Sequence, residues 1–145
     1  MRFEERTIIE APPEGVWAVL SDWERQPEWM PDVARIRLLR TERELGARLE
    51  VRTNVFGIPL ATDLVEVTAW EPPRRLAIRH VGVVVGTGEW RLAPAPTGTA
   101  FTWLEAFRMP PPVLGGLGLW LYSPWQRTML RRSIRNLKRI AEGRH

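Results

Sequence analysis

The fold is decided near the N-terminus by residues 9–22, IEAPPEGVWAVLSD. The preceding stretch, residues 2–11, mixes apolar and charged side chains in a way that predicts a strand. Pro12 and Pro13 then suit the first turn of a helix, where a missing backbone N–H costs nothing. Apolar residues within 16–20 give that helix one buried face. The stretch therefore predicts a strand that passes directly into a short helix.

A second short helix and several strands follow. Ser21 and Asp22 end the first helix and are suited to cap a second one through residues 23–29, which Pro31 stops. From residue 33 apolar residues occur at every second position, most clearly in residues 47–55. This alternation is expected for strands with one solvent-exposed face. Turn signals separate the further strands expected at 60–70, 75–81, 83–92 and 100–109. Short strands at this spacing predict an antiparallel sheet.

The C-terminal part predicts a long helix. Ser123-Pro124-Trp125-Gln126 matches a capping box, with proline at the first helical position. Apolar residues then recur at helical spacing through residues 124–141, about 27 Å of helix at 1.5 Å per residue. The leucines at 114, 117 and 121 also have helical spacing, but on a stripe out of phase with the later one. We therefore expect a kink or break at Ser123-Pro124.

The composition limits the possible functions. The chain has 145 residues, which fits one domain, 1–145, with a core that needs no disulfide. It has no cysteine and only two histidines, one of them the last residue, so we expect no metal site and no cofactor. The first residues carry acidic side chains where a signal peptide needs an apolar run, and we expect a cytoplasmic protein.

The positive charge is concentrated at one end. Residues 127–145 hold seven basic residues and one acidic residue, whereas the rest of the chain has a net charge of −2. No aromatic residue follows Arg127, and stacking aromatics are what a nucleic-acid surface would interleave with its basic residues. The pattern indicates the solvated face of an amphipathic helix and no nucleic-acid partner.

The order of elements predicts an α+β fold: a strongly bent antiparallel sheet of about six or seven strands around a long C-terminal helix, with two short helices after the first strand. Residues 9–22 and Pro27-Glu28-Trp29-Met30-Pro31 resemble the opening of the START-like (SRPBCC) helix-grip superfamily. Three further segments resemble the polyketide cyclase/dehydrase and lipid transport branch of it: Glu71-Pro72-Pro73-Arg74-Arg75-Leu76, Gly88-Glu89-Trp90-Arg91-Leu92 and residues 130–142.

The resemblance implies an apolar cavity between the sheet and the last helix. Such proteins include lipid and sterol carriers, aromatic cyclases and quinone-binding proteins, so fold alone does not choose among them. Strand parity turns one face of each strand toward the cavity, and the side chains expected there are Leu49, Val51, Val55, Leu76, Ile78, His80, Trp90, Phe101, Trp103, Glu105 and Phe107. The aromatic members either stack on a ring-bearing ligand or simply fill the core.

Three titratable groups share that face: His80, Glu105 and, by the same parity, Asp63. A carboxyl in an apolar cavity has its pKa raised, and His80 is the one central histidine, so these residues are candidates for acid–base chemistry on a ketone. The alternative is structural: one β-bulge would reverse the parity and leave a carboxylate paired with an arginine at the surface.

The charge-free segment 109–126 is expected at the mouth of the cavity. Its prolines and glycines make a spanning helix improbable, and its apolar residues predict a gate for a lipophilic ligand, with transient contact to a membrane surface, or else packing in the core or in a homodimer. The residues expected there are Leu114, Leu117, Trp120, Leu121 and Trp125. The chain is thus expected to act as a monomer or a homodimer.

These features favour a binding or carrier protein for a hydrophobic small molecule: a lipid, a quinone or a polyketide-like aromatic. The first alternative is a polyketide cyclase or dehydratase that uses His80 and Glu105 as acid and base. The second is an interaction module whose cavity is filled by side chains. The scarcity of acid–base groups makes catalysis the less favoured of these functions.

Overall fold

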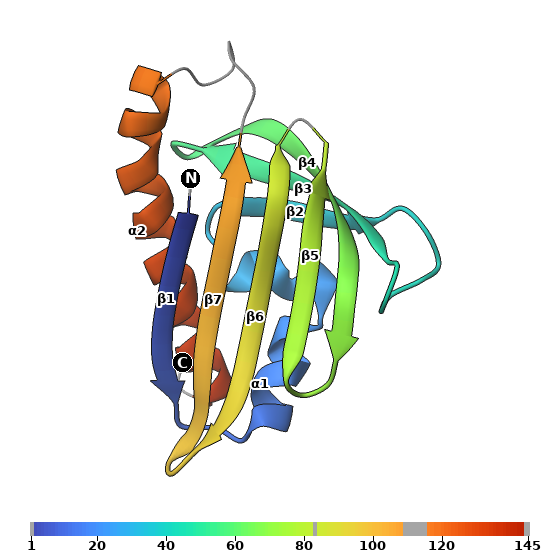
Figure 1. Ribbon diagram of the computed structural model, residues 1–145, viewed down its shortest axis with the longest axis vertical. Helices are drawn as coiled ribbons and strands as arrows, with labels where there is room; N and C mark the ends of the chain where they lie inside the picture. Colours follow the sequence, from blue (N-terminus) through green and yellow to red (C-terminus); the bar gives the residue numbers. More distant parts are fainter. Residues whose placement is uncertain (1, 83, 109–115, 144–145) are drawn as a thin grey trace.

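The computed structural model describes residues 2–82, 84–108 and 116–143 as a bent sheet with a long helix along one side (Figure 1). In this part of the chain, seven strands pair antiparallel in the order β1-β7-β6-β5-β4-β3-β2. Their bounds are β1 Arg2–Ile9, β2 Val33–Leu38, β3 Arg48–Val55, β4 Ile58–Glu71, β5 Arg75–Val81, β6 Val85–Ala95 and β7 Gly98–Arg108.

Two short helices follow β1, as predicted: α1 Pro13–Leu20 and the 3-10 helix η1 Trp23–Glu28. Asp22 does occupy the position before η1, but its side chain makes no capping hydrogen bond to the helix backbone. The predicted side-chain cap is therefore wrong. Instead η1 is held by burial, since Trp23 and Gln26 are both buried.

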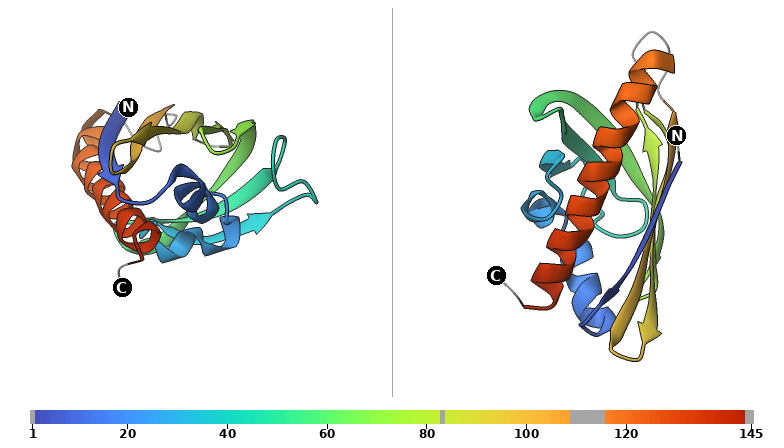
Figure 2. Two further views of the ribbon diagram at one scale, coloured as in Figure 1. Left: turned by 90° about the horizontal axis from the view of Figure 1, so that it is seen from below. Right: turned by 90° about the vertical axis from the view of Figure 1, so that its left-hand side faces the viewer.

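The sheet curls so that the long helix α2, Gly116–Ala141, closes the side between the edge strands β1 and β2 (Figure 2). At one edge, Arg131 Nε donates to Glu5 Oε1 on β1 at 3.1 Å. Toward the other, Asn136 Nδ2 donates to the carbonyl of Trp29, just before β2, at 3.2 Å. The predicted architecture, a bent antiparallel sheet that grips a C-terminal helix, is confirmed.

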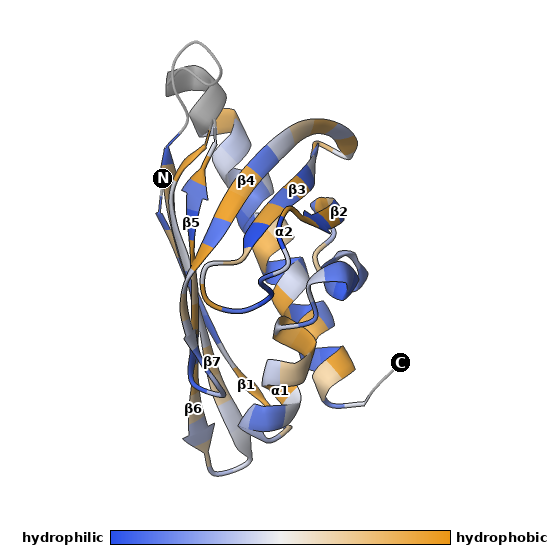
Figure 3. Ribbon diagram, turned by 90° about the vertical axis from the view of Figure 1, so that its right-hand side faces the viewer, coloured by the Kyte–Doolittle hydropathy of each residue, from blue (hydrophilic) through white to orange (hydrophobic). Residues whose placement is uncertain are grey.

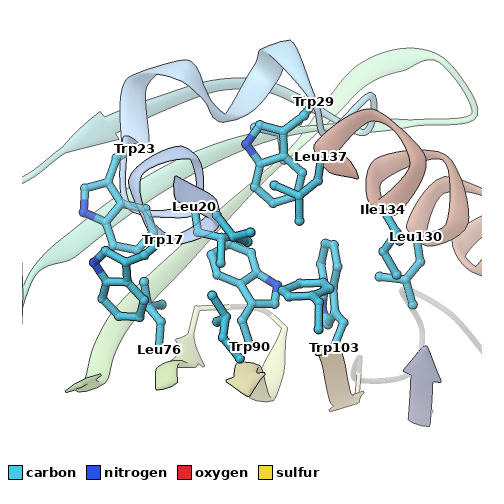
Figure 4. Packing of buried hydrophobic residues seen from close by; sticks show 14 of the residues in the cluster. Trp17, Leu20, Trp23, Trp29, Leu76, Trp90, Trp103, Leu130, Ile134 and Leu137 are labelled. Atoms are coloured by element: carbon cyan, nitrogen blue, oxygen red, sulfur yellow. The ribbon is translucent and has the colours of Figure 1, made fainter. Parts of the chain in front are cut away.

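The core lies between the concave face of the sheet and the helices. Figure 3 shows apolar residues at intervals along α2, and Figure 4 shows Trp90 and Trp103 of the sheet facing Trp29 and Leu137. The rings of Trp90 and Trp103 lie 5.5 Å apart and nearly perpendicular, the edge-to-face arrangement that aromatic pairs prefer. Trp70, on β4, packs against Trp17 with 5.2 Å between ring centroids.

The helix α2 differs from its prediction, because it continues through Ser123 and Pro124 without a break. The predicted cap at Ser123 is therefore wrong as well. Proline removes one helical hydrogen bond, but Tyr122 before it and Leu130 after it are both buried. Packing on both sides of Pro124 thus holds the helix together, and 26 residues give a length of about 39 Å.

Candidate functional site

A cavity of about 580 Å³ lies between the concave face of the sheet and α2. Most of its lining is apolar, with side chains from η1, from strands β1 to β7 and from α2. The residues that sequence parity placed on this wall and that do line it are Leu49, Val51, Val55, Leu76, Ile78, His80, Trp90, Trp103, Glu105 and Phe107.

Phe101 is the exception to that placement. It is buried but does not line the cavity. Phe101 pairs with Leu92 across β6 and β7, in the part of the sheet where α1 packs against both strands. Phe101 therefore belongs to the packed core beside the cavity. Parity indicated its face of the sheet but not its position along the strand.

The three titratable candidates meet in one hydrogen-bonded group, which we call the His80 cluster: Asp63, His80 and Glu105. The two ring nitrogens of His80 are each bonded to a carboxylate, Nδ1 to Asp63 Oδ2 at 2.6 Å and Nε2 to Glu105 Oε1 at 2.8 Å. All three side chains are at least 86% buried and line the cavity. No bulge reverses their parity, since the register shift in β3 and β4 lies between Thr53 and Asn54, and that of β4 and β5 between Val67 and Ala69.

The carboxylates hold His80 in its charged form. Burial alone would lower the pKa of His80, but the hydrogen bonds and charges of Asp63 and Glu105 outweigh burial and raise it to about 10. At neutral pH the imidazolium therefore donates both of its N–H groups to carboxylates. A histidine in this state is a poor general base, because it has no free lone pair.

The neighbours of Glu105 fix its position. Trp103 Nε1 donates to Glu105 Oε2 at 3.1 Å, from the adjacent position on the same face of β7. Gly88 lies opposite Glu105 in the pairing of β6 with β7, and a Cβ at Gly88 would be 2.7 Å from Glu105 Oε2. Glycine at this position thus leaves room for the carboxylate beside His80.

Sequence reasoning missed several polar residues of the wall, among them Gln26, Asp32 and Tyr122. Burial raises the pKa of Asp32 to about 6, with a smaller contribution from the charge of Glu105. Burial, together with nearby carboxylates, also raises the pKa of Tyr122, whose hydroxyl donates to Gln126 Oε1 at 3.0 Å. Asp32 and Gln26 lie outside any strand period, so no pattern could indicate which way they face.

Of the residues predicted at the mouth, those that the structure describes, Trp120, Leu121 and Trp125, do not line the cavity. Trp120 and Leu121 are exposed, Trp120 to 72%, whereas Leu114 and the side chain of Leu117 lie outside the described residues. Trp125 packs against Phe56, with 5.3 Å between ring centroids.

Phe56 occupies the two-residue turn Phe56-Gly57 between β3 and β4, and both residues have positive φ, 51° and 84°. The turn therefore directly follows the strand predicted at residues 47–55. A positive φ is uncommon for phenylalanine, whereas glycine adopts it freely. Phe56 and Leu60 line the cavity and are also exposed, so this turn forms part of the cavity's rim.

Membrane-spanning helices and metal sites are both absent from the described residues 2–82, 84–108 and 116–143. None of the helices there is long and apolar enough to cross a membrane. Within the same ranges, no three side chains of the metal-binding types are grouped so that they could hold a metal ion. In the His80 cluster, neither ring nitrogen is free to bind a metal ion, because each is already hydrogen-bonded to a carboxylate.

Comparison with known proteins gives relatives over the whole chain. The uncharacterised protein Rv2574 of Mycobacterium tuberculosis is 26% identical over 151 residues, which cover 98% of this chain and 85% of the relative. Among solved structures, TTHA0849 from Thermus thermophilus superposes with a TM-score of 0.81 at 19% identity, over 97% of each chain.

A second solved structure is the di-domain ARO/CYC StfQ from the steffimycin biosynthetic pathway, with a TM-score of 0.79 and 18% identity. The alignment covers 98% of this chain but half of StfQ. These likenesses show the helix-grip fold. The profile of the family described as polyketide cyclase / dehydrase and lipid transport matches residues 1–142. The predicted relationship is confirmed: the chain belongs to the polyketide cyclase / dehydrase and lipid transport family.

Proposed function

We propose that this protein binds and carries a hydrophobic small molecule in the cavity between its sheet and α2. The observation that supports the proposal is the cavity itself: about 580 Å³, largely apolar, with the hydrogen-bonded His80 cluster in its lining. Sites for small molecules have this size and composition. A cavity of this volume favours a carrier over an interaction module with a filled core.

The exposed apolar rim supports an entrance at the Phe56 turn. Phe56 and Leu60 line the cavity and are exposed, and Ile58 between them is exposed as well. Trp120 and Leu121 on α2 are further exposed apolar residues, but they do not line the cavity. Such a rim suits transient contact with a membrane surface while the ligand is exchanged. Flotation with neutral phospholipid vesicles tests this: Phe56→Ser should weaken the contact, and equal flotation of variant and wild type would contradict it.

The binding proposal is tested by filling the cavity. Val51 lines it from β3, and Val51→Trp adds an indole to the open space. The matched control, Thr87→Trp, adds the same group at an exposed position of β6 that does not line the cavity. We expect wild type and Thr87→Trp to bind the neutral probe N-phenyl-1-naphthylamine with equal affinity, and Val51→Trp to bind it at least tenfold more weakly. Equal binding by all three proteins would place the probe outside the cavity.

The His80 cluster favours a second candidate function, that of a cyclase or dehydratase. In that case the His80 imidazolium would act as an acid toward a ketone oxygen, with Glu105 receiving a proton elsewhere in the cycle. We rank this function second because both N–H groups of His80 are already bonded to carboxylates. Turnover of a poly-β-keto substrate by wild type and His80→Ala tests it, and equal rates would remove His80 from the mechanism.

A further inference from the structure

The polar wall of the cavity is acidic. The carboxylates among its described lining residues are Asp32, Asp63, Glu89 and Glu105, and the one basic side chain among the same residues is His80. The chain as a whole has 21 lysine and arginine residues and a net charge of +4, so its arginines are directed elsewhere. The ionisable side chains of the cavity are thus mainly acidic, whereas the protein as a whole has a positive net charge.

Two of these carboxylates are already neutralised by neighbours. Glu89 is paired with Arg75 and Arg91, which do not line the cavity. Glu105 accepts from both His80 and Trp103, one bond to each oxygen. His80 in turn has no N–H left for a ligand. An anionic ligand would therefore find no free cation among the described residues of this wall.

The other two carboxylates have spare acceptors. Among the described residues, Asp32 Oδ1 and Asp63 Oδ1 have no hydrogen-bond partner, although both atoms are buried. Asp32 is 91% buried, and its pKa is raised chiefly by that burial, as expected for a carboxyl whose charge is poorly compensated. A buried acceptor without a donor is costly, so a ligand that supplies the donor gains affinity.

One donor of the cavity lining is also unpartnered. Gln26 is 95% buried and lines the cavity, and its Nε2 finds no acceptor in the part of the chain that the structure describes. A ligand hydroxyl can both donate to a carboxylate and accept from this amide, whereas an ammonium group can only donate.

We propose that the ligand is a hydrophobic molecule whose polar end donates hydrogen bonds, as a hydroxyl or an ammonium group, and that the acidic wall around Asp32 and Asp63 selects it against carboxylates and against purely accepting groups. The inference rests on the proposed function, because it assigns the polar end of a ligand held in the same cavity. It disfavours fatty-acid anions and oxidised quinones among hydrophobic ligands, and it favours phenols, alcohols and amines.

A matched ligand series tests the proposal by titration calorimetry at pH 7.5. The four ligands share one hexylphenyl body: 4-hexylphenol, 4-hexylbenzylamine, 4-hexylanisole and 4-hexylbenzoate. We expect the phenol and the amine to bind at least about tenfold more tightly than the anisole, and the benzoate to bind most weakly. The ratio of phenol to amine distinguishes the two kinds of donor.

Protein variants assign the selectivity to the wall. Asp32→Asn and Asp63→Asn should each reduce the preference for the amine over the anisole severalfold. Glu66→Gln is the control, since Glu66 lies on β4 but pairs with Arg48 and Arg79 and does not line the cavity. Thermal unfolding of each variant verifies that it is folded.

The outcomes separate this proposal from the proposed function. Binding of all four ligands with equal affinity, or tightest binding of the benzoate, would overturn the donor preference and leave the carrier function intact. If the preference for the amine over the anisole is unchanged in both Asp32→Asn and Asp63→Asn, the acidic wall is not the source of the selectivity. Binding of none of the four would count against both proposals together.

Discussion

Alkaline pH should destabilise this protein through one residue, His80. Its pKa is about 10 in the folded protein and 6.5 in a solvated chain, so the folded state binds the proton more tightly. A group whose folded pKa is raised contributes its full stability below the unfolded pKa and loses it as the pH rises through the folded pKa. The window for His80 is therefore pH 6.5 to 10.

The magnitude follows from the pKa difference. Within the window, the contribution of His80 to the free energy of unfolding falls by about 1.4 kcal/mol for each pH unit, which amounts to about 4 kcal/mol between pH 7 and 10. Asp32 titrates in a separate window: its pKa is raised from 3.8 to about 6, so its contribution changes between those values and is constant above pH 7. The two effects do not overlap.

Urea unfolding of wild type and His80→Gln, measured at intervals from pH 7 to 10, isolates the residue. The variant removes one partner of a buried ionic group and should be less stable at pH 7, by about 3–5 kcal/mol. The difference between the two proteins should shrink as the pH rises, because only wild type loses the His80 contribution. A difference that is constant from pH 7 to 10 would refute the raised pKa and with it the bonding of His80 to both carboxylates.

Three further predictions concern packing, the cluster and the rim. Gly88→Ala should displace Glu105 from His80, cost about 1–3 kcal/mol in urea unfolding and lower the pKa of the histidine in an NMR titration; an unchanged pKa would contradict the predicted clash. Phe56→Asn keeps a residue that tolerates positive φ but removes the ring at the rim, so stopped-flow fluorescence should show severalfold faster uptake of a neutral probe at similar stability, and an unchanged rate would place the entrance elsewhere. Leu137→Ala should cost about 2–5 kcal/mol, against less than about 0.5 kcal/mol for the exposed Leu45→Ala, and equal losses would contradict the packing of α2.

Much of the fold could be predicted from the sequence because it depends on local periodicity. The alternation in residues 47–55 indicates a strand with one buried face, and strand parity alone turned Asp63, His80 and Glu105 to the same side. Parity propagates reliably here because the described bulges lie outside the segments that carry these residues.

The features that the sequence did not reveal depend on tertiary contacts. The continuity of α2 through Pro124 is stabilised by packing against the sheet, which overrides a local helix-breaking signal. Asp32 follows Pro31 outside any helix or strand. No periodic pattern in the sequence could therefore indicate that it is buried near the charge of Glu105. Phe56 takes a turn position that favours glycine, and its ring contacts Trp125 from a distant part of the chain. Phe101 shows that parity gives the face of a residue but not whether the space in front of it is open.

The central claim is that the cavity of about 580 Å³ holds a hydrophobic molecule. Native mass spectrometry of the protein purified from its own host tests this most directly, with Val51→Trp purified in parallel. We predict one bound molecule for each wild-type chain, an amine or a hydroxyl compound without a carboxylate, and its loss from the variant. Wild-type protein that is empty, or that carries the same molecule as the variant in equal amount, would contradict the claim.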